Sequence, residues 1–166
     1  PDLEYTNGVG TCDYTHGLLR LFPVPLFHLV FHDALIPFSH AGDDYTTTDG
    51  TAFEDKVLRD LLRGIPPMYF LNLWDHRKWR RKIMDSYVAT SPTAAAVMYD
   101  EMLSHELVTD DQMVQRTTFA SGVEATVNFD EIQREMLPAK GFRVTGLPEG
   151  THTGSFTSSL QSAVRP

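Results

Sequence analysis

The sequence predicts an α/β segment followed by an antiparallel β segment, on three observations. A proline-bounded apolar stretch at residues 23–36 leads through a polar loop into a helical pattern at residues 51–64. From residue 112 onward the pattern becomes that of short strands. We therefore expect an α/β part at residues 1–108, an antiparallel β part at residues 109–146, and a tail or linker at residues 147–166.

The apolar stretch is predicted to be a strand buried on both faces. It is short, rich in Val, Ile and Phe, and flanked by Pro23, Pro25 and Pro37. Strand, loop and helix would make one β–loop–α unit of a parallel sheet. A single unit leaves the strand's backbone unpaired on both edges, so we expect the missing strands to come from an upstream part of the chain or a partner chain. The polar residues 1–17 are expected to form a loop.

The helix at residues 51–64 has recognisable ends. Thr51 and Glu54 have the spacing of a capping box, and Gly64 suits the position just past the last turn. A second helix is expected at residues 75–89, with the basic cluster 77–82 in solvent. Ser91-Pro92 would begin a third helix that ends near His105.

The β part is marked by alternation. Val123, Ala125 and Val127 alternate with polar residues, which is typical of a half-buried strand, and Ser121-Gly122 would form the preceding turn. Further strands are expected at residues 112–119, 134–137 and 142–145.

Composition excludes several classes of protein. The chain has 14 basic and 22 acidic residues, a formal net charge of −8, which disfavours nucleic acid as a partner. No apolar run reaches the ~18 residues that a membrane span needs. The single cysteine, Cys12, excludes an internal disulfide and a cysteine-based zinc site.

Polar side chains gather at the carboxyl end of the predicted strand, where ligands bind in parallel α/β folds. We expect this cluster either to bind sugar hydroxyls or to carry out acid–base chemistry, and it comprises His32, Asp33, His40, Asp43 and Asp44. Under the alternative interpretation, Asp33 caps the loop, Asp43 and Asp44 are solvated, and His28 is a core histidine.

Metal and haem chemistry fit the sequence less well. The pair His28-x-x-x-His32 would suit zinc only on a helix, and the prolines disfavour a helix there. A metal site of His32, His40 and Asp43 stays open. Phe31-His32-Asp33 resembles part of the distal motif of haem peroxidases, but His28 stands where that motif has arginine. We expect no cofactor and no metal.

Several motifs together carry a family resemblance: Pro25 to Asp33, Pro66 to Tyr69, Ser104 to Glu106, Val114 to Phe119, Val127 to Phe129 and Leu137 to Phe142. They resemble the C-terminal part of large TIM-barrel glycoside hydrolases, in particular bacterial enzymes related to the endo-α-N-acetylgalactosaminidases.

The resemblance implies a fold and a role. Residues 24–36 would be the last strand of a (β/α)8 barrel, the helices would pack outside it, and residues 112–145 would begin or form a β-sandwich. The chain would be a C-terminal fragment of a hydrolase whose partner is carbohydrate, and the resemblance suggests a secreted or cell-surface location. His32 and Asp33 would contact substrate, and the catalytic carboxylates would lie upstream of Pro1. The alternatives are a non-catalytic carbohydrate- or protein-binding module and, more weakly, a haem peroxidase-like fragment.

Overall fold

The computed structural model describes residues 4–7, 10–13, 25–39, 51–69 and 73–156. Its elements, in chain order, are β1 (Glu4–Asn7), β2 (Gly10–Asp13), α1 (Leu26–Phe31), β3 (Phe38–Ser39), α2 (Thr51–Arg63), α3 (Leu73–Val97), β4 (Met102–Leu107), β5 (Val114–Phe119), β6 (Glu124–Asn128), β7 (Gly141–Leu147) and β8 (Gly150–Ser155).

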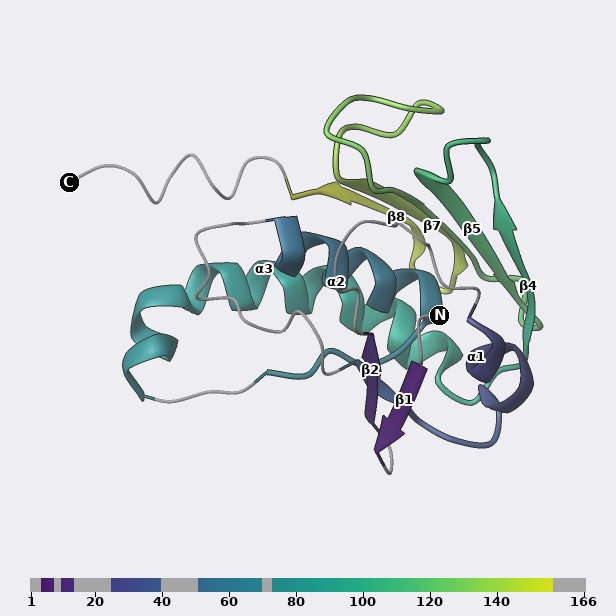
Figure 1. Cartoon of the computed structure of the whole chain (residues 1–166), viewed down its shortest axis with the longest axis horizontal. Helices are drawn as coiled ribbons and strands as arrows, with labels where there is room; N and C mark the ends of the chain where they lie inside the picture. The colour runs from purple at the N-terminus through teal and green to yellow at the C-terminus, as the bar shows by residue number, and fades with distance from the viewer. Residues whose placement is uncertain (1–3, 8–9, 14–24, 40–50, 70–72, 157–166) are drawn as a thin grey trace.

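The strands form two sheets. The larger sheet has the order β4-β5-β6-β7-β8, and every neighbouring pair in it is antiparallel. The smaller sheet has the order β1-β2-β3. Its strands β1 and β2 are antiparallel, and β2 and β3 are parallel over two residue pairs. In Figure 1, α2 and α3 lie against one side of the large sheet, and α1 lies at its β4 end.

One hydrophobic core joins the two long helices to the large sheet. Its buried side chains come from α2, α3 and the strands, and include Phe53, Leu58, Leu61, Val97, Phe119, Val127, Phe142 and Val144. The core thus draws on both sides of residue 108. The division of the chain into segments ending at residues 108 and 146 stays a prediction. Within the described ranges, no helix is long and apolar enough to cross a membrane.

The prediction of a strand at residues 23–36 is wrong, because residues 26–31 form α1. Pro25 stands at the N-cap, where a missing N–H does no harm, and its carbonyl accepts the first helical bond from Leu29 N at 2.9 Å. His32 N donates to His28 O at 3.1 Å. The prolines therefore permit a short helix here, and the Val, Ile and Phe content was a weaker guide than their position.

Helix α2 confirms the prediction for residues 51–64, including its end. Gly64 has φ +63, its N–H donates to Leu61 O at 3.2 Å, and Ile65 N donates to Asp60 O at 3.1 Å. This pair of bonds is the Schellman arrangement, which satisfies the last carbonyls of a helix. The capping box is not formed by Glu54, whose carboxylate oxygens are buried without a hydrogen-bond partner.

The prediction of two helices at residues 75–89 and 91–105 is also wrong. One helix, α3, runs through Pro92 to Val97, and His105 lies in β4. Proline inside a helix removes one backbone donor and costs about 3 kcal/mol. Ala89, Ala94 and Val97 are buried on both sides of Pro92, so core packing offsets this cost.

The antiparallel strands confirm the prediction for residues 112–129. Val123, Ala125 and Val127 are buried, and Phe119 N donates to Val123 O across the predicted turn. Five strands were not predicted. β1 and β2 lie in the expected loop, β3 and β4 lie where no strand was expected, and β8 lies in the expected tail, where it pairs with β7. Arg134 and Leu137 form an isolated bridge, and β7 begins at Gly141.

We expect Gly64→Ala to lower the free energy of unfolding by about 2–4 kcal/mol. A Cβ at this positive φ would overlap Val97 Cγ2 and would lie 2.9 Å from Phe119 Cζ. The control is Gly122→Ala, where φ is +87 but nothing lies within 4 Å of the added Cβ. Urea unfolding should show the smaller loss, about 1–2 kcal/mol, for the control. Equal losses would contradict the packing argument.

Candidate functional site

Helix α1 has its polar side inward. His28 and His32, one helical turn apart, are buried, whereas Leu26, Val30 and Phe31 are exposed. This is the reverse of an ordinary surface helix, in which the apolar stripe faces the core. The imidazole rings of the two histidines have centroids 6.4 Å apart.

Both ring nitrogens of His32 contact backbone carbonyls. Nε2 lies 2.7 Å from Arg63 O at the end of α2, and Nδ1 lies 2.6 Å from Asp100 O, just before β4. A carbonyl oxygen only accepts, so a His32 ring nitrogen that carries a proton donates it to the carbonyl that it faces. The ring also packs against Phe119 of β5, with centroids 5.2 Å apart. His32 therefore ties three segments together and leaves no ring nitrogen for a sugar hydroxyl in this arrangement.

Asp33 follows His32 directly and is exposed. The other predicted site residues, His40, Asp43 and Asp44, lie outside the described residues. Of the five predicted substrate-binding residues, the described part of the chain thus holds His32 and Asp33. Their assignment to substrate binding stays a prediction, and Asp33 is the one whose carboxylate faces solvent.

Two further histidines near α1 lack full hydrogen bonding. Both ring nitrogens of His28 and Nε2 of His105 are buried without a partner, while His105 Nδ1 lies 3.2 Å from Thr117 Oγ1. Burial, together with the positive charges of Arg63 and His32, lowers the pKa of His28 to about 2. Burial and the charge of Arg63 lower the pKa of His105 to about 4. Both rings are therefore neutral at pH 7.

Glu54 is a buried carboxyl that the sequence interpretation used only as a helix cap. Its side chain is 4% exposed, and Oε1 lies 3.7 Å from Lys82 Nζ. Burial raises the pKa of Glu54, and the charge of Lys82 opposes that shift. A raised carboxyl pKa is the property of a general acid, but this group is enclosed and faces a lysine, so it has no route to a substrate here.

The helical α1 reopens the question of zinc. A His-x-x-x-His pair on a helix can bind zinc, but both nitrogens of His32 are engaged by carbonyls. Among the described residues, no three His, Cys, Asp or Glu side chains come together as a metal site would require. The alternative metal site of His32, His40 and Asp43, which the sequence leaves open, includes two residues outside the described part of the chain. The same engagement of His32 disfavours the haem peroxidase interpretation.

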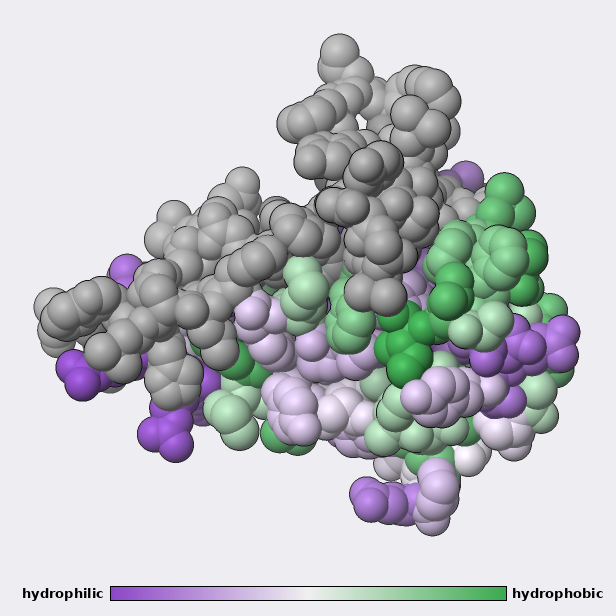
Figure 2. Space-filling model, turned by 90° about the horizontal axis from the view of Figure 1, so that it is seen from below, coloured by the Kyte–Doolittle hydropathy of each residue, from purple (hydrophilic) through white to green (hydrophobic). Residues whose placement is uncertain are grey.

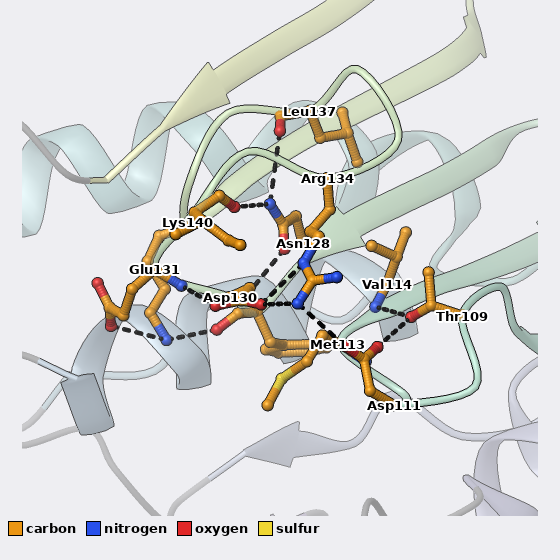
Figure 3. Close-up of polar contacts among 12 residues, drawn as sticks. Thr109, Asp111, Met113, Val114, Asn128, Asp130, Glu131, Arg134, Leu137 and Lys140 are labelled. Atoms are coloured by element: carbon orange, nitrogen blue, oxygen red, sulfur yellow. Dashed lines mark hydrogen bonds and ion pairs between the residues drawn. The ribbon is translucent and has the colours of Figure 1, made fainter.

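A second polar cluster holds the loop between β6 and β7 (Figure 3). Asn128 Nδ2 donates to Ile132 O at 2.8 Å and to Pro138 O at 2.9 Å, while its Oδ1 accepts from Asp130 N at 2.9 Å. Arg134 then joins Asp130, at 2.8 Å, to Asp111, at 3.2 Å. The motifs at residues 127–129 and 137–142 are therefore in contact with each other.

Lys140 connects this cluster to α2. Its Nζ donates to Phe129 O at 2.6 Å and to Asp55 Oδ1 at 2.8 Å, and it lies 3.3 Å from Glu131 Oε1. The lysine is almost fully buried, so its ion pair with Asp55 is better shielded from water than a surface pair. Asn128 and Lys140 therefore have a structural role: their contacts hold the loop between β6 and β7 against α2.

Comparison with known protein families assigns the chain to a family. A family model described as glycosyl hydrolases related to the GH101 family, GH129, matches residues 19–118, well over half of the chain. The chain belongs to the GH129 glycosyl hydrolases. The matched region runs through α1, α2, α3 and β4 to near the end of β5, so it contains His32 and Asp33. It confirms the predicted resemblance to this group of hydrolases.

Solved structures of one bacterial enzyme are similar to part of this chain. The α-N-acetylgalactosaminidase NagBb from Bifidobacterium bifidum matches as a quadruple mutant with 29% identity and a TM-score of 0.50, covering 64% of this chain and 16% of NagBb. The ligand-free form matches at 29% and 0.47, covering 64% and 16%, and the GalNAc complex at 30% and 0.46, covering 64% and 17%. No curated protein sequence matches. The GH129 chain thus spans less than a fifth of the length of these relatives.

The sequence interpretation of the GH129 chain missed the inward side of α1. The sequence predicts His105 at the end of a helix. The structure has it in β4, the strand that contacts α1, and the prediction gives no indication of this position. The signal that existed was the four-residue spacing of His28 and His32, which places both on one face of a helix. The prolines that flank the segment weigh against a helix when the sequence is considered alone.

The free energy of unfolding should fall as pH drops from 7 toward 4. His28 and His105 bind protons at pH 6.5 in an unfolded chain but only near pH 2 and 4 when folded, so the unfolded state takes up more protons in this window. Each histidine contributes at most about 1.4 kcal/mol per pH unit. The raised pKa of Glu54 acts with the opposite sign, because the folded state then binds a proton more readily.

Two variants separate the contribution of His28 to this pH dependence from that of the other groups. Urea unfolding of His28→Leu between pH 7 and pH 4 should show a clearly shallower loss of stability than the unchanged chain. Phe27→Leu, a change of apolar residue on the same helix, should shift stability equally at every pH. An unaltered pH slope in His28→Leu would show that His28 is not a buried neutral histidine.

We expect Asn128→Ala to destabilise the chain by about 2–3 kcal/mol. The change leaves the carbonyls of Ile132 and Pro138 without the side-chain donor that they have now. Thr126→Ala, on the same strand but on its half-exposed side, should cost less than 1 kcal/mol. Similar urea midpoints for the two variants would contradict a structural role for Asn128.

Proposed function

We propose that this GH129 chain is part of a glycoside hydrolase that cleaves α-linked N-acetylgalactosamine from glycans. The observation that carries the proposal is the family match over residues 19–118, supported by the similarity to NagBb, an α-N-acetylgalactosaminidase. Because the chain spans 16% of NagBb, the activity is proposed for the larger protein. The part played by this chain is proposed to be a contact with the sugar.

Asp33 is the residue proposed to make that contact. Its carboxylate is exposed, and a carboxylate accepts hydrogen bonds from sugar hydroxyls and amides. His32 is proposed to act as a positioning residue, because its two carbonyl contacts fix the end of α1 from which Asp33 projects. His40, Asp43 and Asp44, in the segment that follows, remain proposed members of the same site.

The catalytic carboxylates are proposed to lie outside the described residues. Glycosidases use two carboxyl groups on opposite sides of the glycosidic bond, one of which protonates the leaving oxygen while an oxocarbenium-like transition state forms. The most enclosed carboxyls described here face lysines: Asp60 lies 2.8 Å from Lys56 Nζ, and Glu54 lies near Lys82. Both are closed to a substrate.

The proposal includes a (β/α)8 barrel, which the family resemblance implies. Helices α1, α2 and α3 would pack on the outside of that barrel, and the five-stranded sheet would belong to the β-domain that follows it. The stretch at residues 24–36 does not supply the proposed barrel strand, since α1 occupies its residues 26–31. The barrel strands would therefore be contributed by other parts of the enzyme, and the second sheet of a sandwich likewise.

Asp33→Asn should lower kcat/KM for an aryl α-N-acetylgalactosaminide by about 10- to 100-fold in an enzyme that contains this chain. That factor corresponds to losing one charged hydrogen bond, about 1.5–3 kcal/mol. The matched control is Asp110→Asn, a change at an exposed aspartate in the turn between β4 and β5. An unchanged kcat/KM in Asp33→Asn would remove Asp33 from the substrate site.

A further inference from the structure

The outward side of α1 is a continuous set of large apolar side chains. Leu26 is 66% exposed, Val30 63%, Phe31 45%, and Leu35, just past the helix, 46%. We call these four residues the α1 face. The inward side of the same helix carries His28 and His32, so the helix is inverted relative to a helix that lies between a core and water.

The neighbouring edge of the large sheet extends this surface. Helix α1 contacts β4, and β4 exposes Leu103 at 55% and Leu107 at 44%. In Figure 2, apolar residues gather on the visible surface at the end of the molecule where Figure 1 shows α1 and β4. Single exposed apolar residues are ordinary, but a gathered group of them is typical of an interaction surface.

A second copy of the chain is the less favoured occupant. The formal net charge of −8 makes two copies repel each other, and the α1 face offers no charged side chains that could compensate. The rest of the enzyme is favoured by two findings. The family match runs straight through α1, and the chain accounts for 16% of the length of NagBb.

We infer that the α1 face is the docking surface for the remaining part of the GH129 hydrolase, which meets it with a complementary apolar surface. The inference rests on the proposed function, and it deepens that function in one respect. Asp33 is exposed two residues past the end of α1. Docking on the α1 face would therefore place Asp33 at the boundary between the two parts, and boundaries of this kind are common sites of ligand binding.

The test measures association, not hydrolysis, so its failure is distinguishable from failure of the proposed activity. The probe is NagBb from which the segment that matches this chain has been removed, titrated with the purified, labelled 166-residue chain. We expect binding, at least 10-fold weaker for Val30→Asp and for Leu26→Ser. Both side chains are mostly in solvent, so each variant should keep the circular dichroism spectrum of the unchanged chain.

The matched control is Met136→Asp, because Met136 is 86% exposed and lies far along the chain in the loop before β7. This variant should bind as the unchanged chain does. Absence of binding, or equal weakening by Met136→Asp and Val30→Asp, would overturn the inference. Sedimentation of the chain alone tests whether a second copy occupies the α1 face. A dimer that dissociates in the Val30→Asp variant would assign this face to a second copy and would also overturn the inference.

Discussion

The arrangement around the candidate site depends on the two contacts of the His32 ring. One ring nitrogen reaches the last carbonyl of α2, and the other reaches the carbonyl of Asp100 ahead of β4. A short helix of six residues has little stability of its own, since its few internal bonds hardly offset the cost of nucleation. The His32 contacts hold it in place, turn its polar side inward, and thereby present both Asp33 and the α1 face to the outside.

A second set of contacts joins α2 to the loop between β6 and β7. Lys140 joins Asp55 of α2 to the carbonyl of Phe129, and Asn128 closes the loop whose end carries Lys140. Asn128, Phe129 and Lys140 belong to the motifs at residues 127–129 and 137–142 that contribute to the family resemblance. Their contacts give these two motifs a structural role, because they hold the loop between β6 and β7 against α2.

The sequence was informative where one local signal dominated. Helix α2 was predictable because its apolar spacing and Gly64 agree, and β6 was predictable because strict alternation of apolar and polar residues leaves one interpretation. Residues 23–36 were not, because prolines and β-branched residues favoured a strand while tertiary hydrogen bonds to His32 favour a helix. Pro92 misled in the same way: local propensity predicted a helix start, and core packing of Ala89, Ala94 and Val97 carries the helix through. For the candidate site, the assignment of His32 and Asp33 stays a prediction, and the sequence could not show that His32 is buried and Asp33 exposed.

The most direct test of this account is a crystal structure of a GH129 enzyme containing this chain with N-acetylgalactosamine bound. The measured quantities are the distances from the sugar to the Asp33 carboxylate and to the His32 ring nitrogens. The account predicts Asp33 within hydrogen-bond distance of the sugar, and His32 still bound to the carbonyls of Arg63 and Asp100. A sugar held by His32, or a bound sugar remote from Asp33, would contradict it.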